Sequence, residues 1–164
     1  MLSMILNEVR RDALQKVKKD DWSKEELGEL MDVLSRMILM AELAREEGLL
    51  SLEEEAYRVE VTNFLQELIK RGAIAIVDAY EPEELEDYLT TLYWVYELQG
   101  MEALASYCII KGLTMIQLNK YSLSVQKMLL ATLPLKYQEV CLEAVNSTLD
   151  EYRKMGKLSG FADN

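Results

Sequence analysis

Apolar residues recur every three or four positions along almost the whole chain, which is the spacing of one buried face of an α-helix. The first such stretch covers residues 2–19. A second begins at Ser23, where the sequence S-x-x-E fits a capping box, and ends at Gly48, since glycine adopts the left-handed conformation that closes a helix. Another S-x-x-E sequence at Ser51 predicts that a third helix starts there.

The middle of the chain predicts two further helices. Residues 64–77 keep helical spacing, although Gly72 lies among them and costs about 1 kcal/mol relative to alanine, so we expect a kink or a close helix contact there. Residues 73–77 also alternate weakly, as a strand would, but nothing else in the chain offers a partner strand, and the helix is favoured. Pro82 and the glutamates after it mark the next helix start, because proline suits the first position and carboxylates suit the positive end of the helix dipole.

The C-terminal part is helical as well. Helical spacing resumes at Leu104, pauses near residues 121–122, and returns in a short segment and in a last helix that Pro134 opens. We find no internal repeat and no linker. The pattern predicts an all-α fold, a single compact bundle of six or seven helices. Its expected parts are an N-terminal helix in residues 1–22, a middle region in 23–100, C-terminal helices in 101–155 and a frayed tail in 156–164.

Length and charge limit the classes of function that fit this protein. The chain has 164 residues, which fits one helical domain over residues 1–164. Its net charge is −11, and residues 51–100 alone carry 12 acidic and 3 basic side chains. An acidic surface disfavours nucleic acids and anionic membranes, because both bind through basic patches. The N-terminal sequence does not resemble a signal peptide, and no stretch of about 18 apolar residues is present, so we expect a cytoplasmic protein without a membrane span.

Residue types that commonly carry catalysis are scarce. The sequence has no histidine, no phosphate-binding glycine loop, and no metalloprotease or hydrolase motif. Cys108 and Cys141 both lie in apolar surroundings and are interpreted as small buried hydrophobic residues. We therefore expect no catalytic residues, no cofactor and no metal ion, and hence no enzyme. One alternative stays open, a small-molecule binder or enzyme built from carboxylates, which an apolar pocket with a perturbed glutamate would favour.

Three short motifs resemble a known family. Residues 43–53 read L-A-R-E-E-G-L-L-S-L-E, and the sequence continues with A-I-V-D-A at residues 75–79 and P-E-E-L at residues 82–85. Over about residues 37–99 this pattern is similar to the first cytoplasmic helices of MotA, the stator A-subunit family of the bacterial flagellar motor. The resemblance covers less than half of the chain.

The membrane part of that family has no counterpart here. The stator subunit has four membrane spans, and its cytoplasmic helices lead into one of them. The corresponding residues 106–118 contain Lys111, so we do not expect them to cross a bilayer. The resemblance therefore implies neither ion conduction nor torque generation.

The resemblance does imply a binding surface. In the stator family, an arginine and a glutamate at the positions of Arg45 and Glu53 make the charged contact with the rotor protein. The acidic residues Glu54, Glu83 and Glu84 extend the same expected surface. The expected function is that of a non-enzymatic protein-interaction module, whose partner has a basic or mixed-charge surface and is, by resemblance, a flagellar rotor protein.

Two other interpretations stay open. Arg45 can simply pair with the nearby glutamates, since surface ion pairs are common and weak. The protein can also be a self-associating helical scaffold, a homo-oligomer whose tyrosines and methionines form the contact face.

Overall fold

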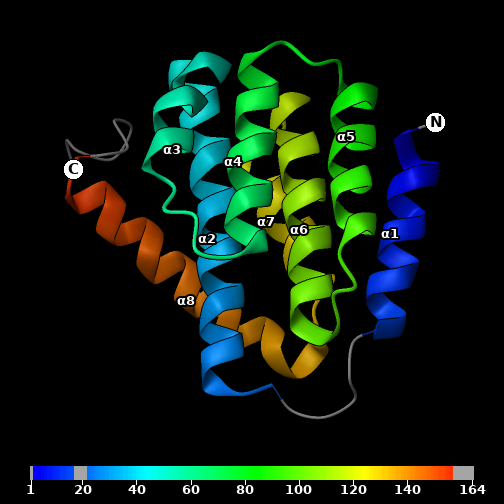
Figure 1. The fold of residues 1–164 in the computed structure, drawn as a ribbon. Coiled ribbons are helices and arrows are strands. Elements are labelled where there is room, and N and C mark those ends of the chain that lie inside the picture. The colour runs from blue at the N-terminus through cyan, green and yellow to red at the C-terminus, as the bar shows by residue number, and fades with distance from the viewer. Residues whose placement is uncertain (1, 17–21, 157–164) are drawn as a thin grey trace.

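The fold was obtained as a computed structural model, which describes residues 2–16 and 22–156. These residues form eight α-helices and one 3₁₀ turn, and no β-strand occurs among them (Figure 1). In chain order the elements are α1 (Leu2–Lys16), α2 (Lys24–Glu47), η1 (Leu49–Ser51), α3 (Leu52–Arg58), α4 (Phe64–Val77), α5 (Pro82–Val95), α6 (Gly100–Gln117), α7 (Ser122–Leu130) and α8 (Leu135–Lys154).

The all-α prediction is confirmed, but the predicted count of six or seven helices is wrong. The two shortest helices, α3 with 7 residues and α7 with 9, are too short to be stable alone, so packing against longer helices must stabilise them. Residues 73–77 belong to α4 and do not form a strand. The expected end of the first helix at residues 17–19, and residues 157–164 of the expected tail, lie outside the described residues.

Of the two capping boxes predicted, at Ser23 and at Ser51, only the one at Ser23 forms. Ser23 caps α2: its hydroxyl accepts from the Glu26 amide at 3.1 Å, and the Glu26 carboxylate accepts from the Ser23 amide at 3.3 Å. A glutamate pair forms an equivalent box at the start of α5. The box predicted at Ser51 is wrong, because Ser51 already has helical backbone angles and its hydroxyl donates to the Gly48 carbonyl at 2.6 Å. The chain therefore enters α3 through the 3₁₀ turn.

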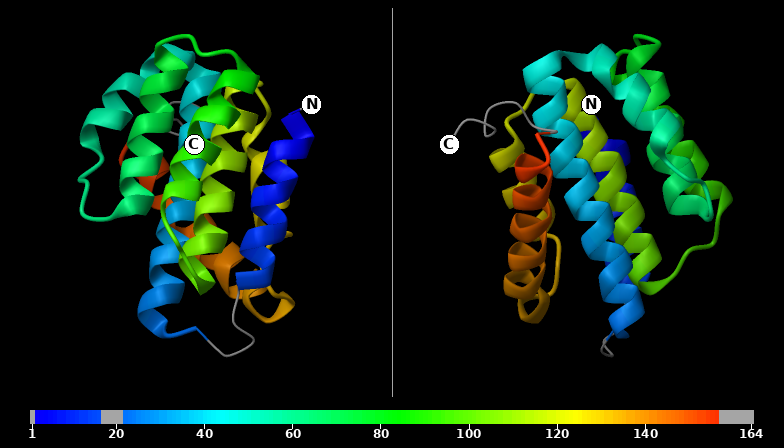
Figure 2. Two further views of the ribbon diagram at one scale, coloured as in Figure 1. Left: turned by 45° about the vertical axis from the view of Figure 1, so that its right-hand side comes forward. Right: turned by 90° about the vertical axis from the view of Figure 1, so that its left-hand side faces the viewer.

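The helices pack in three layers. The right-hand view of Figure 2 shows α7 and α8 on one side, α2 and α6 in the middle, and α3, α4 and α5 on the other side. Helix α1 packs against α5 and α6. Successive helices from α2 to α7 alternate in direction, so the turns after α2, α4 and α6 all lie at the upper end of the bundle in Figure 1.

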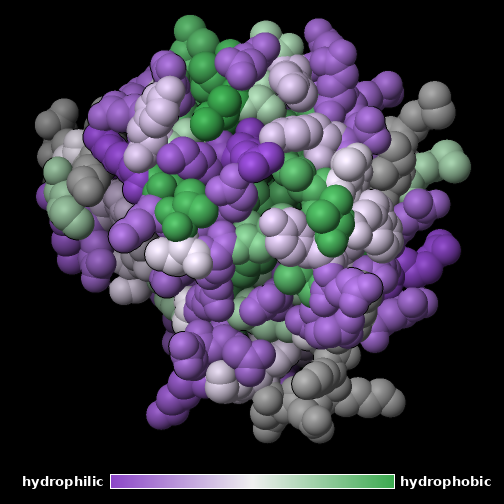
Figure 3. Space-filling view, viewed as in Figure 1, coloured by the Kyte–Doolittle hydropathy of each residue, from purple (hydrophilic) through white to green (hydrophobic). Residues whose placement is uncertain are grey.

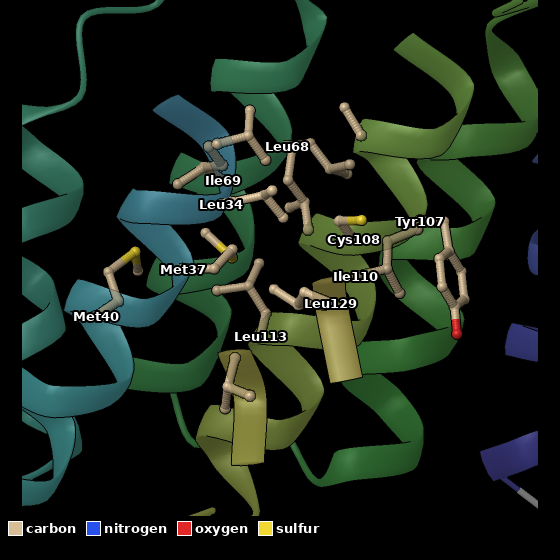
Figure 4. Close-up of a cluster of buried hydrophobic side chains, with 14 of the residues drawn as sticks. Leu34, Met37, Met40, Leu68, Ile69, Tyr107, Cys108, Ile110, Leu113 and Leu129 are labelled. Carbon is tan, nitrogen blue, oxygen red and sulfur yellow. The ribbon is translucent and has the colours of Figure 1, made fainter. Parts of the chain in front are cut away.

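Helix α6 runs through the centre of the bundle. It contacts α1, α2, α4, α5 and α7, and all of its residues are buried except Glu102, Lys111 and Gln117. A helix that is apolar on every side belongs in a core, which is why α6 has no polar face. Side chains of α2, α4 and α7 gather around it in one continuous cluster (Figure 4).

Two glycines let neighbouring helices approach α6 closely. A Cβ atom at Gly72 of α4 would lie 2.3 Å from Leu113 Cδ1 of α6. A Cβ atom at Gly112 of α6 would lie 3.0 Å from Met37 Cγ of α2. The close contact expected at Gly72 is therefore confirmed, and at both positions a larger residue would require the neighbouring side chain to shift.

The hairpins α4–α5 and α6–α7 repeat one design at an offset of forty residues. Gly72 and Gly112 occupy the same place in the two hairpins, and so do Ala79 and Asn119. Ala79 and Asn119 have positive φ angles of 63° and 59° and end their helices with equivalent hydrogen bonds. No internal repeat is expected from the sequence, and the two hairpins share only these glycine and turn positions at the same spacing.

Two polar contacts attach α1 to α5. The Glu86 carboxylate, only 1% exposed, accepts from the Leu6 amide at 3.1 Å, and its second oxygen has no hydrogen-bond partner among the described residues. The Tyr93 hydroxyl donates to the Asp12 carboxylate. Burial raises the pKa of the Glu86 carboxyl, and the opposing effects of the Leu6 amide and Lys111 do not cancel this rise. Relative to the unfolded chain, the fold therefore shifts the Glu86 carboxyl toward its protonated form.

Replacing Gly72 by alanine is expected to lower the free energy of unfolding by about 1–3 kcal/mol, because the new methyl group has no room beside Leu113. Gly28 of α2 is the matched control. A Cβ atom there meets nothing within 4 Å, so Gly28→Ala is expected to raise stability by about 0.5–1 kcal/mol through helix propensity. Urea unfolding followed by circular dichroism measures both, and equal effects would contradict the close approach at Gly72.

Because the pKa of Glu86 is raised in the folded state, the wild-type protein loses stability as the pH rises from the carboxyl's ordinary pKa through this raised value. The Glu86→Gln variant has no such proton to release and can keep the Leu6 contact through its amide oxygen. We expect the stability of the variant relative to wild type to increase as the pH rises above the carboxyl's ordinary value of 4.5. Urea unfolding at several pH values measures this difference, and a constant or falling difference refutes the assignment.

Candidate functional site

Three inter-helix turns meet at one end of the bundle, the upper end in Figure 1. They contain Gly48 after α2, Ala79 after α4 and Asn119 after α6, with φ angles of 89°, 63° and 59°. Positive φ ends the right-handed helix, so the chain reverses within a few residues at each place. The turns bring together residues that lie far apart in the sequence.

Hydrogen bonds join the three turns into one surface. The Arg45 side chain donates to the Asn119 carbonyl, and the Gln117 side-chain amide donates to the Tyr80 carbonyl. The first bond connects the end of α2 to the α6–α7 turn, and the second connects that turn region to the α4–α5 turn. We call this the turn surface, and it comprises Arg45, Leu50, Glu53, Glu54, Tyr80, Glu83, Glu84, Leu118, Asn119, Tyr121 and Leu123.

Arg45, in the last turn of α2, has the most defined position on the turn surface. Its Nη1 donates to the Asn119 carbonyl at 2.9 Å, and its guanidinium carbon lies 3.8 Å from the centre of the Tyr121 ring. This is a cation–π contact combined with a hydrogen bond. Within the described part of the chain, the partners of Arg45 are thus a carbonyl and an aromatic ring rather than the nearby glutamates.

The four predicted acidic residues lie on the turn surface but differ in their hydrogen bonds and ion pairs. Glu53 and Glu83 are exposed and make no hydrogen bond or ion pair with the residues that the structure describes. Glu54 pairs with Arg58 one turn further along α3. The Glu84 carboxylate accepts the capping hydrogen bond at the start of α5, at 3.1 Å. The structure therefore brings all five predicted residues to one end of the bundle and leaves Glu53 and Glu83 available to a partner.

Sequence reasoning emphasised charge and missed the apolar part of the turn surface. Leu50 is 72% exposed and Tyr121 is 65% exposed, and Tyr80, Leu118 and Leu123 are exposed near them. Figure 3 shows hydrophobic residues at this end of the molecule, bordered by hydrophilic ones. The sequence could have indicated these exposed residues through their position. They lie within or directly beside a predicted helix break, where an apolar side chain is hard to bury.

A separate groove of about 370 Å³ lies between α2, α4 and α8. Its base is apolar and its rim carries carboxylates and arginines. Burial raises the pKa of the Glu29 carboxyl in this rim; nearby carboxylates, Glu102 foremost, raise it further, and a hydrogen bond from Asn63 opposes the rise. A small-molecule or enzyme site built from carboxylates is expected to show a perturbed glutamate in an apolar pocket. This groove has the perturbed glutamate, but its lining is only partly apolar.

The two cysteines are both free and buried, which confirms their interpretation as hydrophobic residues. Burial raises the pKa of the Cys108 thiol to about 12, although a hydrogen bond with Thr132 opposes this. A thiol with such a pKa stays protonated at neutral pH and is a poor nucleophile.

Two kinds of feature are absent from residues 2–16 and 22–156. No group of three or more Cys, Asp or Glu side chains there lies close enough together to hold a metal ion. None of the helices in these ranges has both the length and the apolar character that a bilayer crossing requires.

Comparison with known proteins identifies no relative. No protein-family model, no curated protein and no solved structure matches the chain. The resemblance to the stator family therefore rests on the three motifs between residues 43 and 85 alone.

Proposed function

We propose that this protein is an interaction module that docks through the turn surface on a partner protein with a basic or mixed-charge face. One observation carries the proposal: Arg45, Glu53 and Glu83 belong to three helices whose ends lie at one end of the bundle, and that end also exposes Leu50 and Tyr121. Apolar and aromatic side chains within a charged border are typical of the core and rim of protein–protein interfaces.

The charge distribution supports a partner with basic groups. Residues 51–100, which include α3, α4 and α5, carry 12 acidic and 3 basic side chains. Their field attracts a basic partner to this side of the molecule and speeds its association. Arg45 adds a position for one partner carboxylate. Asn119 and Tyr121 already hold its guanidinium, so less side-chain entropy is lost on binding.

The stator resemblance suggests the first partner to test, a flagellar rotor protein. In that family the positions of Arg45 and Glu53 make the rotor contact, and here these two residues lie on the surface that also exposes apolar groups. The proposal takes over this docking role alone, without ion conduction or torque.

Arg45→Glu and Glu53→Arg are each expected to weaken binding to a flagellar rotor protein by about 1–3 kcal/mol, because each reverses a charge opposite the partner. Titration calorimetry with the full chain measures the affinities. Glu143→Arg, on the exposed side of α8, changes the net charge as Glu53→Arg does but lies outside the turn surface, and it is expected to leave binding nearly unchanged.

Circular dichroism separates a binding role from a structural one. If weaker binding reflects a lost charged contact with the partner, the Arg45→Glu and Glu53→Arg variants must keep the helicity of the wild type. Undetectable rotor binding by the wild type, or equal binding by all four proteins, contradicts docking on a rotor protein through the turn surface.

A self-associating scaffold is the second candidate, and one observation favours it. Helices α7 and α8 expose a group of large apolar side chains, and a shallow groove runs between the two helices. The exposed apolar residues are Met128, Leu135, Val140, Leu142 and Leu123, the last of which also belongs to the turn surface. Leu123 and Leu142 line this groove. A second copy of the chain would cover these exposed apolar side chains, and apolar surface of this kind commonly marks an interface.

Light scattering over a range of protein concentrations distinguishes the two candidates. The interaction module is expected to keep the mass of one chain at all concentrations. The scaffold is expected to reach the mass of two chains, and Leu135→Glu is then expected to restore the single-chain mass, because it places a charge in the apolar contact. A dimer that Leu135→Glu leaves intact would exclude the α7–α8 face as the contact.

A further inference from the structure

The groove between α2, α4 and α8 is distinct from the turn surface. Its volume of about 370 Å³ lies within the range of pockets that bind small ligands. Val33, Leu39 and Ile69 are buried residues that line its base. An apolar base of this size accommodates a short aliphatic group.

The basic residues of the groove already form ion pairs with carboxylates. Arg36 and Arg58 flank the carboxylate of Glu55, with nitrogen–oxygen distances of 3.8 Å and 2.9 Å. Arg58 also pairs with Glu54. Two guanidinium groups thus face two carboxylates, and this part of the groove attracts no further charge.

The remaining charged residues of the groove are acidic and lack a cation. Glu29 and Asp32, one turn apart on α2, line the groove together with Glu60. None of the three makes an ion pair with the residues that the structure describes, and the one hydrogen bond of Glu29 comes from the Asn63 amide at 2.8 Å. Burial and neighbouring carboxylates raise the pKa of Glu29, as expected where negative charge is uncompensated.

A serine hydroxyl adds a second, independent feature to the groove. Ser35, three residues after Asp32, lines the groove and is only 6% exposed. The hydroxyls of Thr114 and Thr148, also inside helices, donate to the carbonyl one turn earlier at 2.8 Å and 3.0 Å. Ser35 makes no such bond, nor any other hydrogen bond to a described residue. The Ser35 oxygen is not one of the described side-chain atoms that are both enclosed and unpartnered, so it is reached from the groove and is available to accept from a ligand.

We infer that this groove binds a primary ammonium group carried on a short aliphatic stem. The ammonium lies against Glu29 and Asp32 and donates one of its three N–H bonds to the Ser35 hydroxyl. The stem covers the apolar base at Val33 and Ile69. Such a group supplies both the cation and the hydrogen-bond donor that the groove lacks.

This site is independent of the proposed docking function, and its ligand chemistry has two sources. One is a free aliphatic diamine, and the other is the lysine side chain of a peptide or protein. Both present the same ammonium group on the same kind of stem.

Titration calorimetry of the full chain tests the inference with cadaverine and with Nα-acetyl-lysine amide. At least one is expected to bind with a Kd of about 1 mM or tighter, and 1-pentanol, which has a similar stem without charge, is expected to bind at least about tenfold more weakly. Binding of cadaverine alone identifies a free diamine as the ligand class. Binding of the lysine derivative identifies the lysine side chain of a peptide or protein as the ligand class. Failure of both amines to bind overturns the inference.

Variants locate the site. Glu29→Gln, Asp32→Asn and Ser35→Ala are each expected to raise the Kd by about fivefold or more, while Glu143→Gln, on α8 outside the groove, leaves it unchanged. Circular dichroism checks that each variant is folded. Amide chemical-shift changes near Ser35 in the wild type locate the ligand without any substitution. Wild-type affinity in all three groove variants, or pentanol binding as tight as the amine, overturns the inference.

Discussion

Helix α6 can exist only where other helices cover it on every side, because it has almost no polar face to turn toward water. Gly112 on α6 and Gly72 on α4 bring α2 and α4 close enough to provide much of that cover. Helices α1, α5 and α7 cover the remaining sides. Helix α6 is thus enclosed by protein, and the layered fold follows from this enclosure.

The same packing creates the turn surface. Helices that alternate in direction around α6 place the turns after α2, α4 and α6 at one end. The turns are short and their central residues have positive φ, so apolar side chains such as Leu50 and Tyr121 cannot fold back into the core and stay exposed. Arg45 is fixed there by Asn119 and Tyr121, which belong to a different hairpin. Core packing therefore decides which charged residues share a surface.

Two glutamates illustrate how burial acts on a carboxylate in this fold. Burial raises the pKa of both Glu86 and Glu29. Glu86 is enclosed between helices and accepts the Leu6 amide, so its protonation is linked to the attachment of α1. Glu29 opens to a groove that also contains Asp32 and the unpartnered Ser35, so a cation can reach it. The first carboxylate affects stability, and the second is suited to binding.

The amino-acid sequence by itself determined the all-α class, most helix boundaries, the cap at Ser23 and the buried character of both cysteines. These features depend on apolar spacing and on contacts within one helical turn, which are readable locally. The tertiary structure alone decided the stability of α3 and α7, the recurrence of one hairpin design, the burial of Glu86 and the groove around Ser35. It also placed Arg45 on Asn119 and Tyr121 and exposed Leu50 beside them. These depend on residues as far apart as positions 6 and 86, whose proximity is set by how the helices enclose α6, and no local pattern encodes that.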